Sequence, residues 1–396
     1  MKENAHMQPP LPSTRLTALL LALSLILAAC AALPGASTPA PTVVSSTPAA
    51  AATSTLNSTR PTAAIGITLT DALGRQVRLA RPPQRMVLAG KAVIMLADAI
   101  YLFAEASSRV VAIGRTVQNK LDFIPVIDPN YAGKTVLESS VGPEQIAAAR
   151  PDLVLLKSSV AESLGKPVES LGIPVVYADF ETPEQYQRDL ITLGQIFQNE
   201  DRARQLIAFF QQGVERVSTA VADLQEEQKP RVLLLNYSDR DGAVAFNVPP
   251  LQWMQTLLVQ MGGGRPVWKE AQIGQGWTKV TLEQIAAWDA DQIYIVAYSG
   301  NVSDVIKRLK ADPQWQALRA VKQGALYGFP GDYYSWDQPD ARWILGLTWI
   351  AARIHPERFQ SLDMPQEIRS FYQELYHMDD AAYLKYVQPN LVGDLP

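Results

Sequence analysis

The side chains best suited to chemistry in this sequence are cations and aromatic residues that follow short apolar segments. In the first half, three such segments are followed by Lys91, Arg115 and Lys157. In the second half, the corresponding positions and two further loops carry Tyr237, Trp277, Tyr298, Tyr334 and Trp336. Arg and Lys bind carboxylates or oxyanions, and aromatic rings bind flat or bulky organic bodies. We therefore predict a ligand site for an anionic organic complex, to which both halves contribute.

Each of these assignments has a plainer alternative. Cations that follow strands are often solvated loop residues, and aromatic residues at helical spacing usually pack in the core. The second alternative applies to five residues in helical patterns, namely Trp253, Trp288, Trp315, Trp343 and Trp349. Trp277 and Trp336 lie in loops bounded by Gly or Pro, which favours a role at the site.

The scarce residue types disfavour several function classes. The chain has one Cys and three His, without a cluster of His, Asp and Glu at metal-ligand spacing. A surface lipoprotein hydrolase is an alternative of a different class, but the sequence has no Gly-x-Ser-x-Gly segment. The formal net charge is −4 without a long basic run, which disfavours nucleic acid as a partner. We expect a non-enzyme with no resident cofactor or metal.

The elements that must position these side chains are short strands. Strands are predicted at 85–90, 109–114, 152–157 and 173–178, and again at 231–237, 292–298 and 325–330. Helical patterns lie between them, which indicates two α/β units, and 71–75 is predicted to be a hairpin turn. Ligands of open α/β sheets bind outside the carboxyl ends of the strands, where the cations and aromatic residues stand.

A long helical stretch separates the two units, from about 183 to 227. Its apolar residues recur in steps of three and four at Leu206, Phe210, Val214, Val217, Val221 and Leu224. The polar run 198–202 predicts a break or a new helix cap within it. The pentapeptide at 144–148 recurs at 283–287, each time before an acidic residue and a strand, which indicates one related βα unit in each half.

The N-terminal segment predicts export. Lys2 and Arg15 precede a short apolar run that ends at Cys30, which is typical of a secretory signal. The four residues 27–30 resemble the lipobox of bacterial lipoproteins, in which the Cys receives a lipid and becomes the new N-terminus. Residues 1–29 are then the signal peptide, and the Ala/Ser/Thr/Pro-rich stretch 30–64 is a disordered tether.

Several segments in order resemble a known family: 71–79, 81–90, 143–156, 281–296, 350–359 and 367–372. They are similar to the iron-complex (siderophore and haem) and cobalamin class of substrate-binding proteins of bacterial ABC importers. The resemblance covers residues 67–386. It implies an α/β fold with two Rossmann-like lobes, each a mainly parallel sheet with flanking helices, joined by a single long helix (class III). The implied bounds are 65–182, 183–228 and 229–396.

The resemblance also implies the role. A lipid-anchored monomer at the outer face of the cytoplasmic membrane would capture an iron complex or cobalamin between its lobes and deliver it to a permease driven by a cytoplasmic ATPase. Glu144 and Glu283 match the residues that dock on the permease in related proteins, although a Glu in a first helical turn is also favoured by the helix dipole. The alternative ligand is an oxyanion such as molybdate or tungstate.

Overall fold

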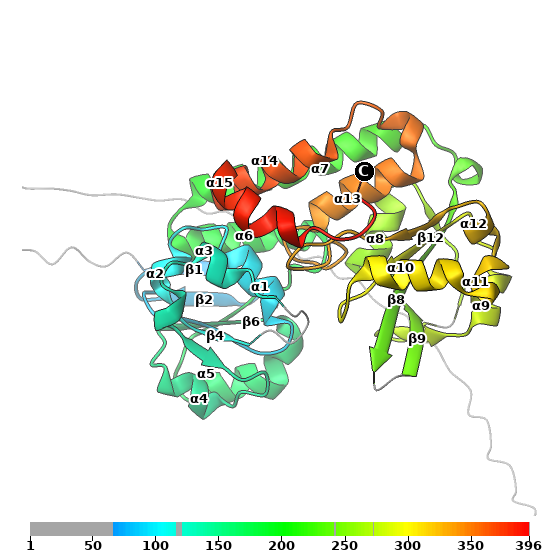
Figure 1. Cartoon of the computed structure of the whole chain (residues 1–396). Helices are drawn as coiled ribbons and strands as arrows, with labels where there is room; N and C mark the ends of the chain where they lie inside the picture. Colours follow the sequence, from blue (N-terminus) through cyan, green and yellow to red (C-terminus); the bar gives the residue numbers. More distant parts are fainter. Residues whose placement is uncertain (1–65, 116–120, 241–242, 272, 396) are drawn as a thin grey trace, which may run out of the picture. The chain divides into compact units, whose positions relative to one another are not determined.

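The computed structural model describes residues 66–115, 121–240, 243–271 and 273–395, which contain two sheets flanked by helices (Figure 1). The predicted signal peptide, Cys30 and the whole of the predicted tether lie outside these residues. Within the described ranges, no helix is both long and apolar enough to cross a membrane.

The first sheet is parallel and has the strand order β5-β4-β3-β6-β7. Its strands are β3 (Met86–Leu88), β4 (Val110–Gly114), β5 (Thr135–Leu137), β6 (Leu153–Leu156) and β7 (Val175–Tyr177). Four of them confirm predicted strands, whereas β5 has only three residues and was not predicted. The chain turns from one side of β3 to the other between β5 and β6, so the carboxyl ends of β3 and β6 form the switch point at which such sheets bind ligands.

Both faces of this sheet are covered, as the continuous apolar strands predict. Alternate residues such as Val87 and Val154 pack with Ile146 of α4 (Pro143–Ala148) and Val168 of α5 (Lys166–Ser170). The intervening residues pack toward α1 (Val93–Ile100) on the opposite face (Figure 1). The predicted turn at 71–75 joins β1 (Ile67–Thr70) to β2 (Gln76–Leu79), and Asp71 accepts hydrogen bonds from the backbone of Leu73 and Arg75.

The second sheet is mixed, with the order β11-β9-β8-β12-β13 and β10 also pairing with β8. The parallel part contains the three predicted strands, which are β8 (Arg231–Arg240), β12 (Gln292–Val296) and β13 (Leu326–Gly328). An antiparallel edge is added by β9 (Ala243–Val248) and β11 (Thr278–Val280), and β10 (Arg265–Pro266) is parallel to β8. Helices of this half include α8 (Met254–Met261), α9 (Leu282–Ala287), α10 (Val302–Ala311) and α13 (Trp343–Ile354).

The connecting stretch contains two helices, α6 (Pro183–Phe197) and α7 (Glu200–Val221). The predicted break falls at Gln198, which has a left-handed backbone with φ 56°, and the side chain of Asn199 caps α7 by accepting from Arg202 N. At 1.5 Å per residue, the 22 residues of α7 span about 33 Å. Leu206, Phe210 and Val217 of the predicted apolar stripe are buried. The single long helix between the lobes is therefore α7.

The C-terminal helices extend the second half back onto the first. Figure 1 shows α14 (Met364–Tyr376) and α15 (Asp380–Ala382) above α3 (Ile124–Ile127). The Phe123 ring lies 5.6 Å from the Tyr372 ring and 5.0 Å from the Tyr376 ring, measured between centroids. The two halves thus share a continuous apolar core in addition to α7.

Candidate functional site

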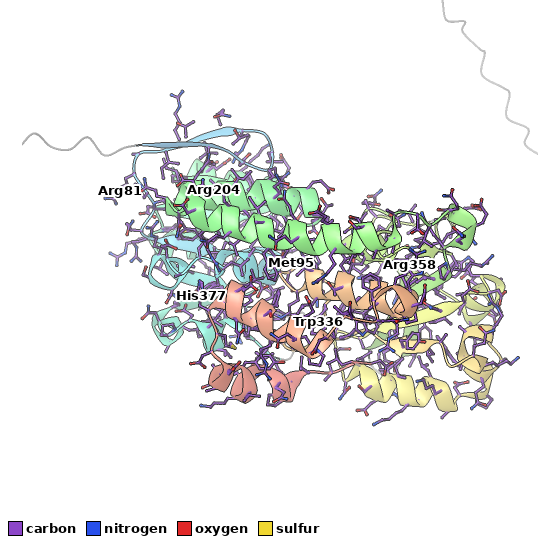
Figure 2. All side chains as sticks on the ribbon, turned by 90° about the horizontal axis from the view of Figure 1, so that it is seen from above. Arg81, Met95, Arg204, Trp336, Arg358 and His377 are labelled. Carbon is purple, nitrogen blue, oxygen red and sulfur yellow. The ribbon has the colours of Figure 1, made fainter. Side chains whose placement is uncertain are left out.

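A cavity of about 640 Å³ opens between residues of the two lobes. The first lobe contributes Ala92, Met95, Ser159, Glu181, Thr182 and Gln185. The second lobe contributes Gln252, Trp253, Gln255, Trp277, Tyr298, Gln338 and Pro339. Ala92 and Ser159 follow β3 and β6, so the cavity lies at the predicted switch point. We call it the cleft. Figure 2 shows Met95 toward the middle of the molecule, whereas Arg81 lies at its left edge.

Three aromatic side chains form one wall of the cleft, which we call the aromatic wall. The ring of Trp277 lies 5.7 Å from that of Trp253 and 6.1 Å from that of Tyr298, and both pairs meet edge to face. Trp277 precedes β11, Trp253 caps the N-terminus of α8, and Tyr298 follows β12. The helical pattern predicted that Trp253 would lie in the core, but it stands before the helix and is only half-buried. Three separate elements thus bring rings to one place.

Asp337 lies behind this wall and orients it. Its Oδ2 accepts hydrogen bonds from Tyr298 Oη at 2.5 Å and from Gln255 Nε2 at 3.1 Å, and its Oδ1 accepts from Ser335 Oγ at 2.5 Å. Burial raises the pKa of Asp337 to about 6, although these three hydrogen bonds oppose the shift. At neutral pH the carboxylate therefore accepts the proton of Tyr298 and one amide proton of Gln255.

The first-lobe wall contains an ion pair of which only the cation is buried. Lys157 follows β6 as predicted, but its ammonium pairs with Glu181 and also lies 3.4 Å from Met95 Sδ. The Lys157 side chain is only 4% exposed, whereas that of Glu181 is 37% exposed. The carboxylate thus faces the cleft and neutralises the cation that the sequence assigned to an anionic ligand.

Gln338 has a polar group without a partner. The residue is 3% exposed, and its Nε2 makes no hydrogen bond with any of the described residues. A buried amide left unpaired costs about 1–3 kcal/mol, and a ligand that pairs it recovers this energy. Gln338 lies two residues after Trp336, just past the loop that carries Tyr334 and Trp336. An amide residue has no spacing signal, so sequence reasoning missed it.

The remaining predicted site residues are dispersed. Lys91 is exposed next to Ala92 at the mouth of the cleft, and Arg115 is exposed and 3.4 Å from Glu138. Tyr237 is buried in β8, where its ring lies 5.8 Å from that of Phe246, and it does not line the cleft. Of the eight predicted residues, only Trp277 and Tyr298 line the cleft directly.

Tyr334 and Trp336 instead belong to a buried cluster that joins the lobes. Tyr334 Oη donates to Asp122 at 3.2 Å and accepts from Phe123 N at 3.0 Å, and Trp336 Nε1 donates to Asp332 at 3.0 Å. Figure 2 places Trp336 near the middle of the view. Tyr334 and Trp336 thus hold the structure together, whereas Gln338, two residues after Trp336, lines the cleft.

The repeated pentapeptide has the same conformation in both lobes. Glu144 and Glu283 are exposed in the first turns of α4 and α9, and in each copy the following Gln accepts from the backbone N of the cap residue at 2.9 Å. The residues six positions after each Glu, Arg150 and Asp289, both have positive φ, at 50° and 40°. This correspondence supports the related βα units that the repeat predicted.

Comparison with known proteins now identifies the fold. A family model described as periplasmic binding protein matches residues 127–333, which is more than half of the chain and includes α7 and strands of both sheets. The chain belongs to this family. The resemblance stated from sequence is confirmed, and this family is one of substrate-binding proteins rather than enzymes.

Relatives of this periplasmic binding protein differ in their ligands. The molybdate-binding protein MolA of Haemophilus influenzae is 23% identical over 256 residues, covering 60% of this chain and 70% of that protein. The iron-uptake system-binding protein of Bacillus subtilis is 22% identical over 188 residues, covering 46% of this chain and 56% of that protein. A periplasmic solute binding protein from Veillonella parvula has a TM-score of 0.67 at 24% identity, covering 81% and 96% of the two chains. This last similarity establishes the fold.

The class III architecture, two lobes connected by one long helix, is thereby confirmed. No group of three or more His, Cys, Asp or Glu side chains within the described ranges is arranged to hold a metal ion.

Proposed function

We propose that this binding protein captures a metal complex with an organic body, such as a ferric siderophore, haem or cobalamin, and delivers it to an ABC permease. The observation that carries the proposal is the cleft itself, with an aromatic wall from one lobe and the unpaired amide of Gln338 beside it. Aromatic surface is unfavourable to leave in water and a buried amide is unfavourable to leave unpaired, so each feature is better explained by a ligand than by folding alone.

The size of the cleft supports an organic ligand. Its volume of about 640 Å³ lies within the range of pockets that enclose small organic molecules, roughly 300–1,000 Å³. A tetrahedral oxyanion would contact only a small part of this surface. Trp253, Trp277 and Tyr298 offer faces and edges for a flat or bulky body, whereas an oxyanion makes no use of them.

An oxyanion such as molybdate or tungstate is the second candidate, because one relative is named for molybdate. The charge of the cleft does not favour it, since Lys157 is paired with Glu181 and Arg115 lies near Glu138. Titration of the full chain distinguishes the candidates by the change in tryptophan fluorescence. The proposal predicts that a ferric siderophore, haem or cobalamin saturates the signal, and it is wrong if molybdate alone does.

The remaining parts of the role follow from the exposed and N-terminal features. We propose that Glu144 and Glu283 dock on the permease, that the protein acts as a monomer, and that a lipid on Cys30 holds it at the outer face of the membrane. Metabolic labelling with a fatty-acid analogue tests the anchor. Label on the wild-type chain that is lost in Cys30→Ser is the predicted result, and an unlabelled wild type contradicts it.

A further inference from the structure

The Glu181 carboxylate lies closer to the surface of the cleft than the cation that pairs with it. Of the described residues that line it, Glu181 is the one with a charged side chain. Its partner Lys157 is buried beneath the lining residues, with its ammonium 3.4 Å from Met95 Sδ. Asp337 adds a second carboxylate directly behind Tyr298 and Gln255. A solute in the cleft therefore faces one carboxylate and lies close to another, while the paired cation is covered.

Apart from the unpaired Gln338 Nε2, which needs an acceptor from the ligand, the second-lobe wall has mainly hydrogen-bond acceptors left to offer. An ionised carboxylate only accepts hydrogen bonds, so Asp337 takes the proton of Tyr298 and one of the amide protons of Gln255. Gln255 Nε2 also donates to Tyr298 Oη at 3.3 Å, so Tyr298 can still offer a ligand its remaining oxygen lone pair, and Gln255 can offer Oε1. No donor among the described residues reaches that Oε1 atom.

The aromatic wall also favours positive charge in a ligand. Aromatic faces carry partial negative charge and attract cations, most strongly for Trp. Trp253, Trp277 and Tyr298 surround one side of the cleft, and the carboxylate of Asp337 lies behind the last of them. Rings backed by a carboxylate form a surface that favours positive charge in a ligand.

The nearby cations do not reverse this preference. Lys91 is exposed beside Ala92 and is not one of the lining residues, and Arg115 is close to Glu138. The buried Arg342 is held by Asp98 and Asp332. Among the described residues, an anionic solute would thus find one exposed cation at the mouth, Lys91, while it faces Glu181.

We infer that the transported solute presents a positive charge or several hydrogen-bond donors to this wall, with Glu181 and Tyr298 as its contacts and Asp337 as a positioning residue. The inference rests on the proposed function and deepens it, because it replaces the anionic complex expected from sequence by a cationic or donor-rich chelate. Ferric hydroxamates with a free ammonium group belong to this chemical class.

The sign of the electrostatic potential in the cleft can be measured without knowledge of the ligand. Five of the eight tryptophans are buried (Trp268, Trp315, Trp336, Trp343 and Trp349), so in a Trp288→Phe background the accessible ones are those of the cleft. Caesium, a cationic quencher, is expected to quench this fluorescence relatively better than iodide, after calibration of both against free N-acetyltryptophanamide. Glu181→Gln should lower the caesium-to-iodide ratio about twofold or more. Glu184→Gln removes the same charge three residues away, outside the lining, and should leave the ratio unchanged. Preferential quenching by iodide overturns the inference and leaves the proposed function standing.

A pair of chelates then tests the ligand directly. Ferrioxamine B carries one free ammonium group, and its N-acetyl derivative has the same iron centre without that charge. We expect the full chain to bind the first about tenfold more tightly, and Glu181→Gln to remove most of the difference. Equal affinity, or tighter binding of the acetylated or an anionic ferric chelate, contradicts the charge inference alone. If no siderophore, haem or cobalamin binds while caesium quenching is preferred, the proposed ligand class fails and the sign of the cleft stands.

Discussion

Arg342 donates a hydrogen bond from Nη1 to Asp98 Oδ1 at 2.9 Å and so joins residues 244 positions apart. Both side chains are fully buried. The guanidinium also donates from Nε to Asp332 at 2.7 Å, and it lies 4.6 Å over the ring of Phe123. Asp98 belongs to α1 of the first lobe, whereas Arg342 caps α13 of the second. One buried cation therefore holds carboxylates from both lobes together beside the cleft.

Removal of this cation should destabilise the protein strongly. Arg342→Met leaves Asp98 and Asp332 buried without their partner, which costs about 3–5 kcal/mol for a buried pair broken on one side. Urea denaturation followed by circular dichroism measures the free energy of unfolding. Arg204→Met breaks an exposed pair with Asp201 and serves as the control, with little expected effect. A loss as small for Arg342→Met as for the control would show that the cluster does not hold the lobes.

Substitution of Gln338 should have opposite effects on the stability of the protein and on its affinity for the solute. Gln338→Leu removes an unpaired buried amide, so the ligand-free protein should be equally stable or more stable. Affinity for the solute should fall about tenfold or more, because the hydrogen bond to the ligand is lost.

Gln255→Leu is the matched comparison, since its amide already donates to Asp337. That variant should lose about 1–3 kcal/mol of unfolding free energy. A destabilised ligand-free Gln338→Leu protein with unchanged affinity would assign Gln338 to the core rather than to the site. Urea denaturation and calorimetric titration give the two quantities.

Binding of a cationic chelate should depend on pH through Asp337, which faces Tyr298, Gln255 and Ser335. Its pKa is raised to about 6 by burial, so the carboxylate is ionised at pH 7 and protonated at pH 5. Protonation removes a negative charge and an acceptor, and affinity should fall by up to about tenfold per pH unit below 6. Asp337→Asn should bind more weakly at pH 7 and lose this dependence.

The role of Asp337 is checked by a control variant at Asp340 and by the pH dependence of stability. Burial also raises the pKa of Asp340, so Asp340→Asn tests whether that residue produces the profile instead. Because the pKa of Asp337 is higher in the folded state, its contribution to stability is greatest below about pH 4 and is lost as pH rises through 6. A profile of affinity unchanged in Asp337→Asn, or abolished only in Asp340→Asn, would remove the role given to Asp337.

The two exposed glutamates should affect transport without affecting capture. Glu144→Arg combined with Glu283→Arg is expected to abolish uptake of the labelled solute by cells, while the affinity of the purified protein stays within about twofold. Glu162→Arg with Glu227→Arg makes the same charge change at exposed positions outside the repeat. Uptake that survives the first pair, or is lost equally with the second, would contradict docking at these sites.

Much of the fold was predictable because buried parallel strands are continuous apolar segments. All seven predicted strands are present, and the break in the connecting stretch falls at Gln198, within the polar run. The strands that escaped prediction are β5, β9, β10 and β11. They are short or carry polar and exposed residues, and only pairing with a neighbour defines them.

The site was less predictable because it depends on partners that are distant in sequence. Lys157 stands where the strand pattern places it, but its charge is taken by Glu181, 24 residues away. Trp336 lies in a loop, and the loop turns inward so that its indole bonds Asp332. Trp253 shows the reverse, because its position just before α8 exposes a ring that periodicity assigned to the core. Position after a strand predicted the region of the cleft but not which side chains face it.

The measurement that tests the central claim most directly is calorimetric titration of the full chain and of a Trp277→Ala, Gln338→Leu double variant with ferrioxamine B. The account predicts one site per chain with a dissociation constant below about 10 μM, weakened at least about tenfold in the variant. Equal binding by the wild type and the variant would show that the solute does not occupy the cleft. An absence of binding to this and to the other metal chelates would contradict the proposed ligand class.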